Sequence, residues 1–419
     1  MRSNRLLAAI AFAWLAISPL LAAPRLKYVV IVSRHGVRSP TWEKARLNRY
    51  SAQPWPEWGV APGELTPHGA ALIGLMGAYY REWLSAEHLI DAHGCHDAGR
   101  VHIVADASQR TLETGRALAE SLMPGCGLLV DSQPGDRKDQ LFSGAGTPDP
   151  QISLSAVRDR MGPDPQKLLA EHRAAIDALQ FILTDGRSAA SALLEPPFQI
   201  GVSLSSKAVE MVGPFSAGST LSEDLLLEYA NGFKGNELGW GRLTRENLLE
   251  VLSLHAVYAD LMRRTPYLAR ARGSNLLDHV LRSMTQAAAG KPVEGALGHP
   301  GDALLVLAGH DTNLSNLSGM LGLSWRLPGY QPDDTPPGGA LIFSLWHGDA
   351  EGDSVTVQYI AQSLDQMRNA DRLTKASPPA SQEVVIPGCK AASGTPGCSW
   401  SSFKLALEKA IDPAFVSTH

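Results

Sequence analysis

The stretch from Tyr28 to Thr41 constrains the fold and the chemistry of this chain more than any other part of it. Residues 28–32, with the sequence YVVIV, form an unbroken apolar run, which is typical of a strand buried on both faces. Arg34, His35 and Arg38 follow directly. Two guanidinium groups this close repel each other unless an anion lies between them, and their geometry matches phosphate oxygens. The stretch therefore predicts a phosphate-binding active site whose histidine is a nucleophile or general base. A surface loop with a chance cluster of cations is the alternative.

A second apolar run, residues 101–105, precedes a helix that the leucine spacing predicts over residues 111–122. Arg110 then lies at the N-terminus of this helix. A cation is unfavourable there, because the exposed backbone amides carry partial positive charge. A bound anion shared by the helix and Arg110 would remove the conflict. An arginine whose side chain reaches out to water is the alternative.

A third apolar run, residues 303–308, ends in Gly309, His310 and Asp311, and a helix is predicted over residues 312–321. Asp311 alone could simply be the N-cap of that helix, since Asp is among the best N-cap residues. However, all three predicted strands are followed by cationic or imidazole side chains. Open α/β sheets bind ligands at the carboxyl ends of their strands. We therefore expect the three strand ends to form one shared site.

The remaining elements are predicted from periodicity and from Gly/Pro punctuation. Helices are expected over residues 165–183, 221–229, 244–264 and 275–288. Stretches rich in Gly and Pro border this helical region at residues 143–150 and 295–301. Two further strands, over residues 340–346 and 355–360, are expected to pair antiparallel at the edge of the sheet.

The composition is that of a globular protein with two domains, or with one domain that carries an insertion. The 419 residues are 44% hydrophobic and 19% charged, and the formal net charge is −5. No basic tract interleaved with aromatic residues is present, so nucleic acid is not an expected partner. An acidic protein binds a polyanion through a local positive pocket, as predicted above.

Residues 1–22 have the pattern of a secretory signal peptide. Arg2 and Arg5 precede an apolar stretch over residues 6–17, and the segment ends in the small residue Ala22. A single membrane anchor is the alternative, but about a dozen apolar residues are too few for a bilayer, which needs about 20. We expect an exported protein, periplasmic or secreted, with no membrane-spanning segment.

The cysteine content agrees with export. The chain has an even set, Cys95, Cys126, Cys389 and Cys398, for which three pairings are possible. Pairing of sequence neighbours, Cys95 with Cys126 and Cys389 with Cys398, closes the shorter loops and is expected. Disulfides imply an oxidising compartment. Two histidines flank Cys95, but no second cluster completes a metal site at ligand spacing.

Other catalytic motifs are missing from the sequence. It has no Gly-x-Ser-x-Gly elbow, no Gly-x-x-x-x-Gly-Lys-Ser/Thr loop and no His-Glu-x-x-His pair. A serine hydrolase, a nucleotide-driven enzyme and a zinc peptidase are therefore not favoured. We expect neither a metal ion nor a cofactor.

Taken together, the motifs resemble those of the histidine acid phosphatases, in particular the bacterial periplasmic phytase and glucose-1-phosphatase branch. The resemblance covers nearly the whole chain after the leader. It is carried by residues 34–41 (RHGVRSPT), 65–69 (LTPHG), 109–111 (QRT), 239–242 (GWGR), 252–255 (LSLH), 309–313 (GHDTN) and 336–339 (PPGG), and by all four cysteines. The motifs at 34–41 and 309–313 are highly specific when they occur together.

The resemblance implies a role for each candidate residue. His35 is the nucleophile that forms a phosphohistidine, and Asp311 protonates the leaving alkoxide. The groups that bind the phosphoryl oxygens are Arg34, Arg38, Arg110 and His310. These residue types suit the chemistry, because phosphoryl transfer depends on in-line positioning and on neutralising the equatorial oxygens.

The resemblance also implies the fold: an α/β protein with a mixed central sheet flanked by helices, phosphoglycerate-mutase-like, with a smaller helical domain inserted. The expected boundaries are residues 1–22 for the signal peptide, 23–150 and 297–419 for the α/β catalytic domain, and 151–296 for the largely helical inserted domain. A monomer acting on a small phosphomonoester is expected.

The substrate is left open between inositol phosphates and sugar phosphates. Thr41, Trp42 and His255 are the predicted substrate contacts, and a buried core histidine is the alternative for His255. Trp42 stands where phytase-like members carry a lysine that meets a second phosphate; an indole instead stacks on a sugar ring. A glucose-1-phosphatase-like enzyme with little phytase activity is therefore one alternative. A phosphoglycerate-mutase-like phosphotransferase or a non-catalytic phosphate-binding protein is a more distant one.

Overall fold

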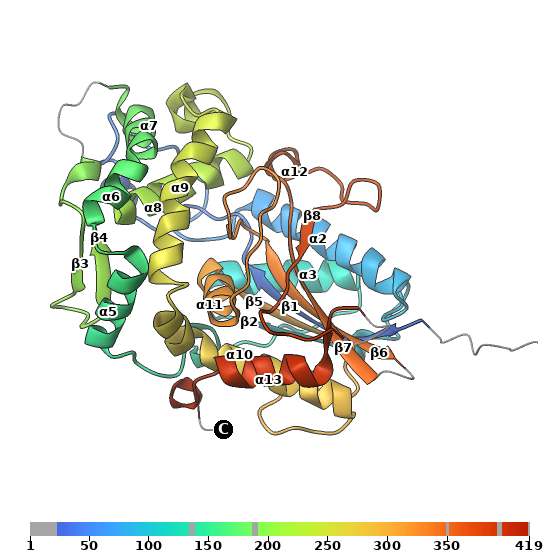
Figure 1. Ribbon diagram of the computed structural model, residues 1–419. Coiled ribbons are helices and arrows are strands. Elements are labelled where there is room, and N and C mark those ends of the chain that lie inside the picture. Colours follow the sequence, from blue (N-terminus) through green and yellow to red (C-terminus); the bar gives the residue numbers. More distant parts are fainter. Residues whose placement is uncertain (1–22, 134–138, 187–191, 349–351, 392–395, 418–419) are drawn as a thin grey trace, which may run out of the picture.

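A mixed sheet forms the centre of the protein (Figure 1). The computed structural model describes residues 23–133, 139–186, 192–348, 352–391 and 396–417. The predicted signal peptide, residues 1–22, lies outside the described residues. The strand order is β2-β5-β1-β6-β7-β8, with β9 paired to β7. The bounds are β1 Arg25–Arg34, β2 Val101–Ala105, β5 Leu304–Gly309, β6 Ala340–Gly348, β7 Gly352–Ala361, β8 Ala380–Glu383 and β9 Cys398–Ser399.

The three predicted buried strands, now β1, β2 and β5, are confirmed as neighbours. β5 lies between β1 and β2 and is parallel to both. In the β1–β5 register, Arg34 lies opposite Gly309. The carboxyl ends of these strands therefore meet at one edge of the sheet, and the two motifs are brought together there.

The two later strands pair antiparallel as predicted, with Ala340 opposite Ile360 in the β6–β7 register. Their expected position at the sheet edge is wrong for both strands, because β6 lies between β1 and β7, and β7 lies between β6 and β8. The uniformly apolar sequence of β6 fits this interior position, because both of its faces are covered.

Alternate residues of β1 pack into different halves of the core, which explains its unbroken apolar run. Val29 and Ile31 pack with side chains of α2 (Pro67–Ala86) and α3 (Gln109–Leu122). Val30 and Val32 belong to the core on the other face. That face is covered by α10 (Pro266–Ala289), α11 (Asp311–Leu321) and α13 (Trp400–Ala410), which Figure 1 shows on the side of the sheet opposite α2 and α3.

A helical unit lies beside the sheet (Figure 1, green to yellow). Its elements are α5 Pro150–Met161, α6 Pro165–Glu171, α7 Arg173–Thr184, β3 Gln199–Val202, β4 Val209–Val212, α8 Pro214–Ala230 and α9 Arg245–Met262. The helix predicted over 165–183 is two helices, α6 and α7, which meet at His172. The β3–β4 hairpin was not predicted, because its strands are short and half-buried. Shorter helices are α1 Lys44–Leu47, α4 Gln140–Ser143 and α12 Leu364–Asn369.

The loop after β1 is held against the N-terminus of α2 by close backbone packing. A Cβ atom on Gly69 would lie 2.1 Å from the carbonyl oxygen of Val37, so only glycine allows this approach. Thr66 caps α2 by accepting a hydrogen bond from the Gly69 amide at 2.9 Å. Its own amide donates to Val37 at 3.0 Å. The conformation of the Arg-His-Gly loop is therefore fixed by its contacts with α2.

The predicted cysteine pairing is confirmed: Cys95 is bonded to Cys126, and Cys389 to Cys398.

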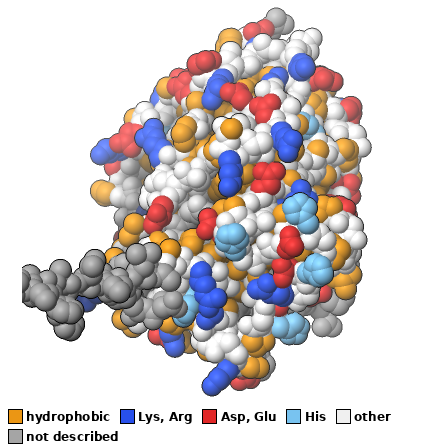
Figure 2. Space-filling view, turned by 90° about the vertical axis from the view of Figure 1, so that its right-hand side faces the viewer, with side chains coloured by type: hydrophobic (Ala, Val, Ile, Leu, Met, Phe, Trp, Pro, Cys, Tyr) orange, Lys and Arg blue, Asp and Glu red, His pale blue; other side chains and the backbone are white. Residues whose placement is uncertain are grey.

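Within the described part of the chain, no helix has the length and apolar character needed to cross a membrane. On the face drawn in Figure 2, acidic and basic side chains are interspersed and do not gather into one basic patch. That face gives no sign of a nucleic-acid site.

Candidate active site

His35 lies at the carboxyl edge of the sheet, directly after β1, with an exposed fraction of 2%. Its amide donates to the Gly309 carbonyl at 2.9 Å, and its ring centre lies 5.5 Å from that of His310. Nδ1 lies 2.8 Å from the Gly36 carbonyl oxygen. A carbonyl can only accept, so Nδ1 carries the proton and Nε2 keeps a free lone pair. Burial lowers the pKa of His35 well below its usual value, and the charges of Arg34 and His310 lower it further.

Arg34 and Arg38 are held side by side by one buried carboxylate, Glu223 of α8. Arg34 donates to Oε1 of Glu223, and Arg38 donates to Oε2 at 3.0 Å. Arg34 also donates to the Thr335 carbonyl at 2.5 Å. Burial raises the pKa of Glu223, but Arg34 and then Arg38 outweigh it and bring that pKa to about 2. Because the depressed pKa favours the ionised form, this bridge is present at ordinary pH and is lost only as pH falls through about 2.

Arg110 and His310 form the second half of the same edge. Arg110 lies in the first turn of α3, and its Nη2 donates to His310 Nδ1 at 3.3 Å. Since that nitrogen accepts, Nε2 of His310 carries the proton and donates to Asp106 Oδ2 at 2.7 Å. Arg110 is therefore turned inward, and the alternative of an arginine reaching out to water is wrong.

Asp311 is the first residue of α11, and His310 occupies the N-cap position. The N-cap interpretation of Asp311 is therefore wrong. Its Oδ1 accepts from the Thr312 amide at 2.8 Å, and its Oδ2 accepts from Arg263 at 2.5 Å. Burial raises the pKa of Asp311, but the cations around it, Arg263 first, bring it well below its usual value. In the absence of substrate this carboxyl group is ionised.

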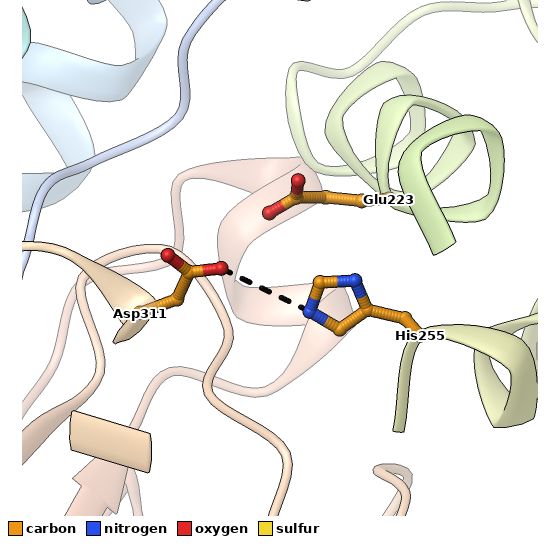
Figure 3. A group of neighbouring side chains, drawn as sticks. All are labelled: Glu223, His255 and Asp311. Atoms are coloured by element: carbon orange, nitrogen blue, oxygen red, sulfur yellow. Dashed lines mark ion pairs between the residues drawn. The ribbon is translucent and has the colours of Figure 1, made fainter. Parts of the chain in front are cut away.

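His255 of α9 reaches the same cluster. Its Nδ1 lies 3.1 Å from the Ser219 hydroxyl, and its Nε2 lies 3.9 Å from Asp311 Oδ2. Figure 3 shows Glu223 and His255 approaching Asp311 from the helical unit, with the imidazole edge aimed at the carboxylate. The buried His255 is thus not confined to the apolar core, and it lies beside a candidate catalytic group.

The other two predicted substrate contacts lie at the end of the loop. Thr41 is exposed and Trp42 is half-buried. The guanidinium of Arg46 lies 3.6 Å from the centre of the Trp42 ring, and the ring of Tyr50 lies 5.6 Å away. The Trp42 side chain is therefore packed on neighbours of its own segment and not on the histidines of the site.

Glu223, His255 and Asp311 are the one group among the described residues whose geometry could suit a metal ion, with ligand atoms within 4.8 Å of one another. The carboxylate oxygens that would have to bind the ion already have partners. Both oxygens of Glu223 accept from arginines, and Oδ2 of Asp311 accepts from Arg263. The guanidinium groups also repel a cation. The residues do not fit a resident metal.

Activity is therefore expected to survive removal of divalent metals. The protein would be dialysed against excess chelator at its working pH, and phosphate release would be measured before and after. Unchanged rates are expected, because the cationic side chains already supply the positive charge that phosphoryl transfer needs. A rate that vanished and then returned with Zn²⁺ or Mg²⁺ would contradict this expectation.

Three neighbours of the site were missed from the sequence: Asp106, Glu223 and Arg263. Asp106 directly follows the strand predicted at residues 101–105, and no role was predicted for it. Glu223 stands beside Asp224 in a helix segment, residues 221–227, whose other members are four leucines and one serine. Two adjacent acidic residues among leucines of a helix could have indicated that Glu223 has a buried partner, because buried charges need partners.

The fold and the site together define a class of α/β phosphate-handling enzymes, in which a neutral histidine faces a set of guanidinium groups at the carboxyl edge of the sheet. The chain belongs to the histidine phosphatase superfamily, branch 2, whose family model matches residues 25–152 and 211–362. This membership confirms the resemblance found in the sequence.

Individual relatives agree with the family. The chain is 35% identical to Phytase AppA of Escherichia coli (strain K12) over 406 residues, which are 93% of each chain. It is 28% identical to a glucose-1-phosphatase of Salmonella typhimurium over 385 residues, 87% of this chain and 88% of the relative. The solved structure of Hafnia alvei phytase in complex with tartrate has a TM-score of 0.86 and 34% identity, covering 95% of this chain and 100% of that chain. The chain is a histidine acid phosphatase.

Proposed function

We propose that this enzyme is exported and hydrolyses phosphomonoesters of the inositol-phosphate or sugar-phosphate type through a phosphohistidine at His35. The main observation in support is that the His35 imidazole is neutral and has a free ring nitrogen. It is buried, its Nδ1 proton is bound to the Gly36 carbonyl, and its pKa is lowered. A neutral ring with a free Nε2 is what a nucleophile needs at acidic pH, where an ordinary histidine is protonated.

In the first step, Nε2 of His35 forms a bond to phosphorus while the ester P–O bond breaks. Asp311, protonated in the complex, gives its proton to the leaving oxygen, so the product leaves as an alcohol. The negative oxygens of the phosphoryl group are bound by the cationic side chains and by the imidazole that were predicted for this role: Arg34, Arg38, Arg110 and His310. Positioning and charge neutralisation are the main contributions of a protein to this transfer.

In the second step, water attacks phosphorus, the N–P bond breaks and inorganic phosphate is released. The Asp311 carboxylate formed in the first step accepts the proton of the attacking water. Glu223 supports both steps indirectly. Because its pKa is about 2, its bridge between Arg34 and Arg38 keeps both guanidinium groups in place across the acidic range.

An inositol polyphosphate is the substrate class that we propose first. The support comes from a relative in sequence and from a relative in structure. Phytase AppA of Escherichia coli is 35% identical to this chain. The Hafnia alvei phytase was also solved in complex with myo-inositol hexakis sulphate, and that structure has a TM-score of 0.85 with 34% identity. Thr41, Trp42 and His255 remain the proposed contacts to the parts of the substrate beyond the reacting phosphate.

A sugar phosphate is the second candidate, and Trp42 favours it. A cavity of about 220 Å³ borders Ser39 and Pro40 and is lined by three indoles, those of Trp42, Trp55 and Trp58. Aromatic faces suit the apolar face of a sugar ring, and the lysine that lines this cavity, Lys44, is already paired with Glu57. The relative from Salmonella typhimurium is a glucose-1-phosphatase, which agrees with this alternative.

The two candidates are separated by kcat/KM for phytate, glucose 1-phosphate and p-nitrophenyl phosphate. The expected order places phytate first, and Trp42→Lys is expected to raise the phytate preference further, because it adds a cation near the second phosphate. A wild-type preference for glucose 1-phosphate would support the sugar phosphatase. No activity on any of the three would contradict the proposed function as a whole.

We also propose the division of the chain into an α/β catalytic domain, residues 23–150 and 297–419, and an inserted domain, residues 151–296. Glu223 and His255 belong to the inserted part and lie beside Asp311 of the catalytic part. The active site would therefore be built by both. Within residues 151–296, α10 packs on β1 and α13, so it connects the two parts. We propose further that residues 1–22 direct export of the protein and that the enzyme is a monomer.

A further inference from the structure

Arg263 is a buried cation whose closest anionic partner is the candidate acid of the reaction. It lies at the C-terminal end of α9. Its Nη1 donates to Oδ2 of Asp311 at 2.5 Å, and both side chains are nearly buried, 13% and 12% exposed. The contact joins α9 of the helical unit to α11 beside the sheet. Nothing in the family resemblance or in the phosphate-binding set assigns a role to Arg263.

We propose that Arg263 is a positioning residue for Asp311: it holds the carboxyl group in one orientation and keeps it ionised until substrate arrives, so that proton donation is confined to lower pH. The inference rests on the proposed function, in which Asp311 is the proton donor. The geometry supports it, because Oδ1 is bound by the Thr312 amide while Oδ2 is bound by Arg263. Because both oxygens are hydrogen-bonded, the carboxyl group of Asp311 is held in one orientation.

Several other charged groups face Asp311 from the surrounding elements. They are Arg34 from β1, Arg110 from α3, Glu223 from α8 and His255 from α9. Arg34 is already paired with Glu223, and Arg110 donates to His310. His255 lies 3.9 Å away, beyond hydrogen-bond distance. Arg263 is therefore the cation in direct contact with Asp311, and of the surrounding charges it lowers the pKa of Asp311 the most.

The surroundings of Arg263 show why it points at Asp311. The ring of Tyr258 lies 5.8 Å from its guanidinium carbon and provides an aromatic face on α9. Arg272 of α10 is close enough for the two positive charges to repel. A guanidinium between these groups is stabilised by an anion on its remaining side, and Asp311 is that anion in the free enzyme. The negative phosphate of a bound ester then weakens this arrangement and favours protonation of Asp311.

The sign of the pH effect follows from this pairing. A general acid works only when protonated, so a lowered pKa moves the alkaline limit of kcat to lower pH. Removing the cation raises that pKa, and an opposite charge in contact is typically worth about 1–3 units. Arg263→Gln and Arg263→Met are therefore expected to move the alkaline limb of kcat upward by about 1–3 pH units on glucose 1-phosphate. Arg263→Lys keeps the charge and is expected to leave the limb near that of the wild type.

The experiment measures kcat and KM from acid to neutral pH on glucose 1-phosphate and p-nitrophenyl phosphate. The limb for p-nitrophenyl phosphate should move less, because nitrophenolate needs little protonation. Arg160→Gln is the matched control, since it removes an arginine that pairs with Asp260 outside the site; its limb should not move. An unmoved limb in both Arg263→Gln and Arg263→Met would overturn the proposal. So would a raised KM with an unmoved limb, which would make Arg263 a substrate contact.

A double variant separates this proposal from the proposed function. In an Asp311→Asn background the alkaline limb should be missing, and adding Arg263→Gln should leave the pH profile unchanged, because the group that it acts on is gone. A shift that persisted there would overturn the role of Arg263 as the partner of Asp311. Full activity of Asp311→Asn itself on glucose 1-phosphate would instead contradict the proposed function. The two failures are therefore distinguishable in one set of proteins.

Discussion

His35→Ala is expected to abolish the turnover of every phosphomonoester, whatever its leaving group. Without the imidazole no N–P bond can form, and water would have to attack the ester directly. Removing the nucleophile of an enzyme that works through a covalent intermediate typically lowers kcat on the order of 10⁵–10⁶-fold. The measurement is phosphate release from phytate, glucose 1-phosphate and p-nitrophenyl phosphate by wild type and variant at the same pH.

A second measurement separates the nucleophile from a phosphate clamp. Rapid quenching of the wild type with labelled substrate should leave label on the protein, stable in base and labile in acid, and His35→Ala should carry none. His102→Ala is a matched control, because this imidazole lies on β2 of the same sheet and pairs with Asp131 away from the carboxyl edge. Equal labelling of wild type and His35→Ala would show that another residue is the nucleophile.

The sheet and its polar edge could be predicted because both depend on local sequence. The apolar runs that became β1 and β5 are buried on both faces, and the last three residues of β2 are buried as well, so almost every residue in them had to be hydrophobic. Parallel strands end at the same edge, and for that reason the structure brings the side chains following them close together. The roles of these side chains in the reaction are still predictions, since proximity alone does not test chemistry.

The contributions of the helical unit could not be predicted in this way, and His255 was expected as a substrate contact only from the resemblance. Glu223, His255 and Arg263 lie on α8 and α9, where the helical period shows which face is buried but not which other chain segment covers it. Only the tertiary packing brings Glu223 to Arg34, 189 residues away in sequence, and Arg263 to Asp311. A buried acid or arginine within an apolar helix signals that a partner exists, and the partner is found only in the fold.

Asp311→Asn is expected to be selective where His35→Ala is not. It removes the proton donor but keeps the size of the side chain, so the nucleophile and the phosphate-binding groups remain. Substrates with alkoxide leaving groups, such as glucose 1-phosphate and inositol phosphates, should lose about 10²–10⁴-fold in kcat, the usual contribution of general acid catalysis. A nitrophenolate leaves with little protonation, so p-nitrophenyl phosphate should lose much less.

The pH profiles provide the decisive comparison for Asp311. The wild-type kcat on alkyl phosphates should fall as pH rises through the protonation of Asp311 in the substrate complex, and this limb should be missing in Asp311→Asn. In the free enzyme the Arg263 pair keeps the pKa of Asp311 well below its usual value, so protonation must accompany substrate binding and an acidic optimum follows. If Asp311→Asn slowed both leaving-group types equally and kept the limb, Asp311 would instead help to hold the phosphoryl group. The buried His255, 3.9 Å from Asp311, would then be the next residue to test as the proton donor.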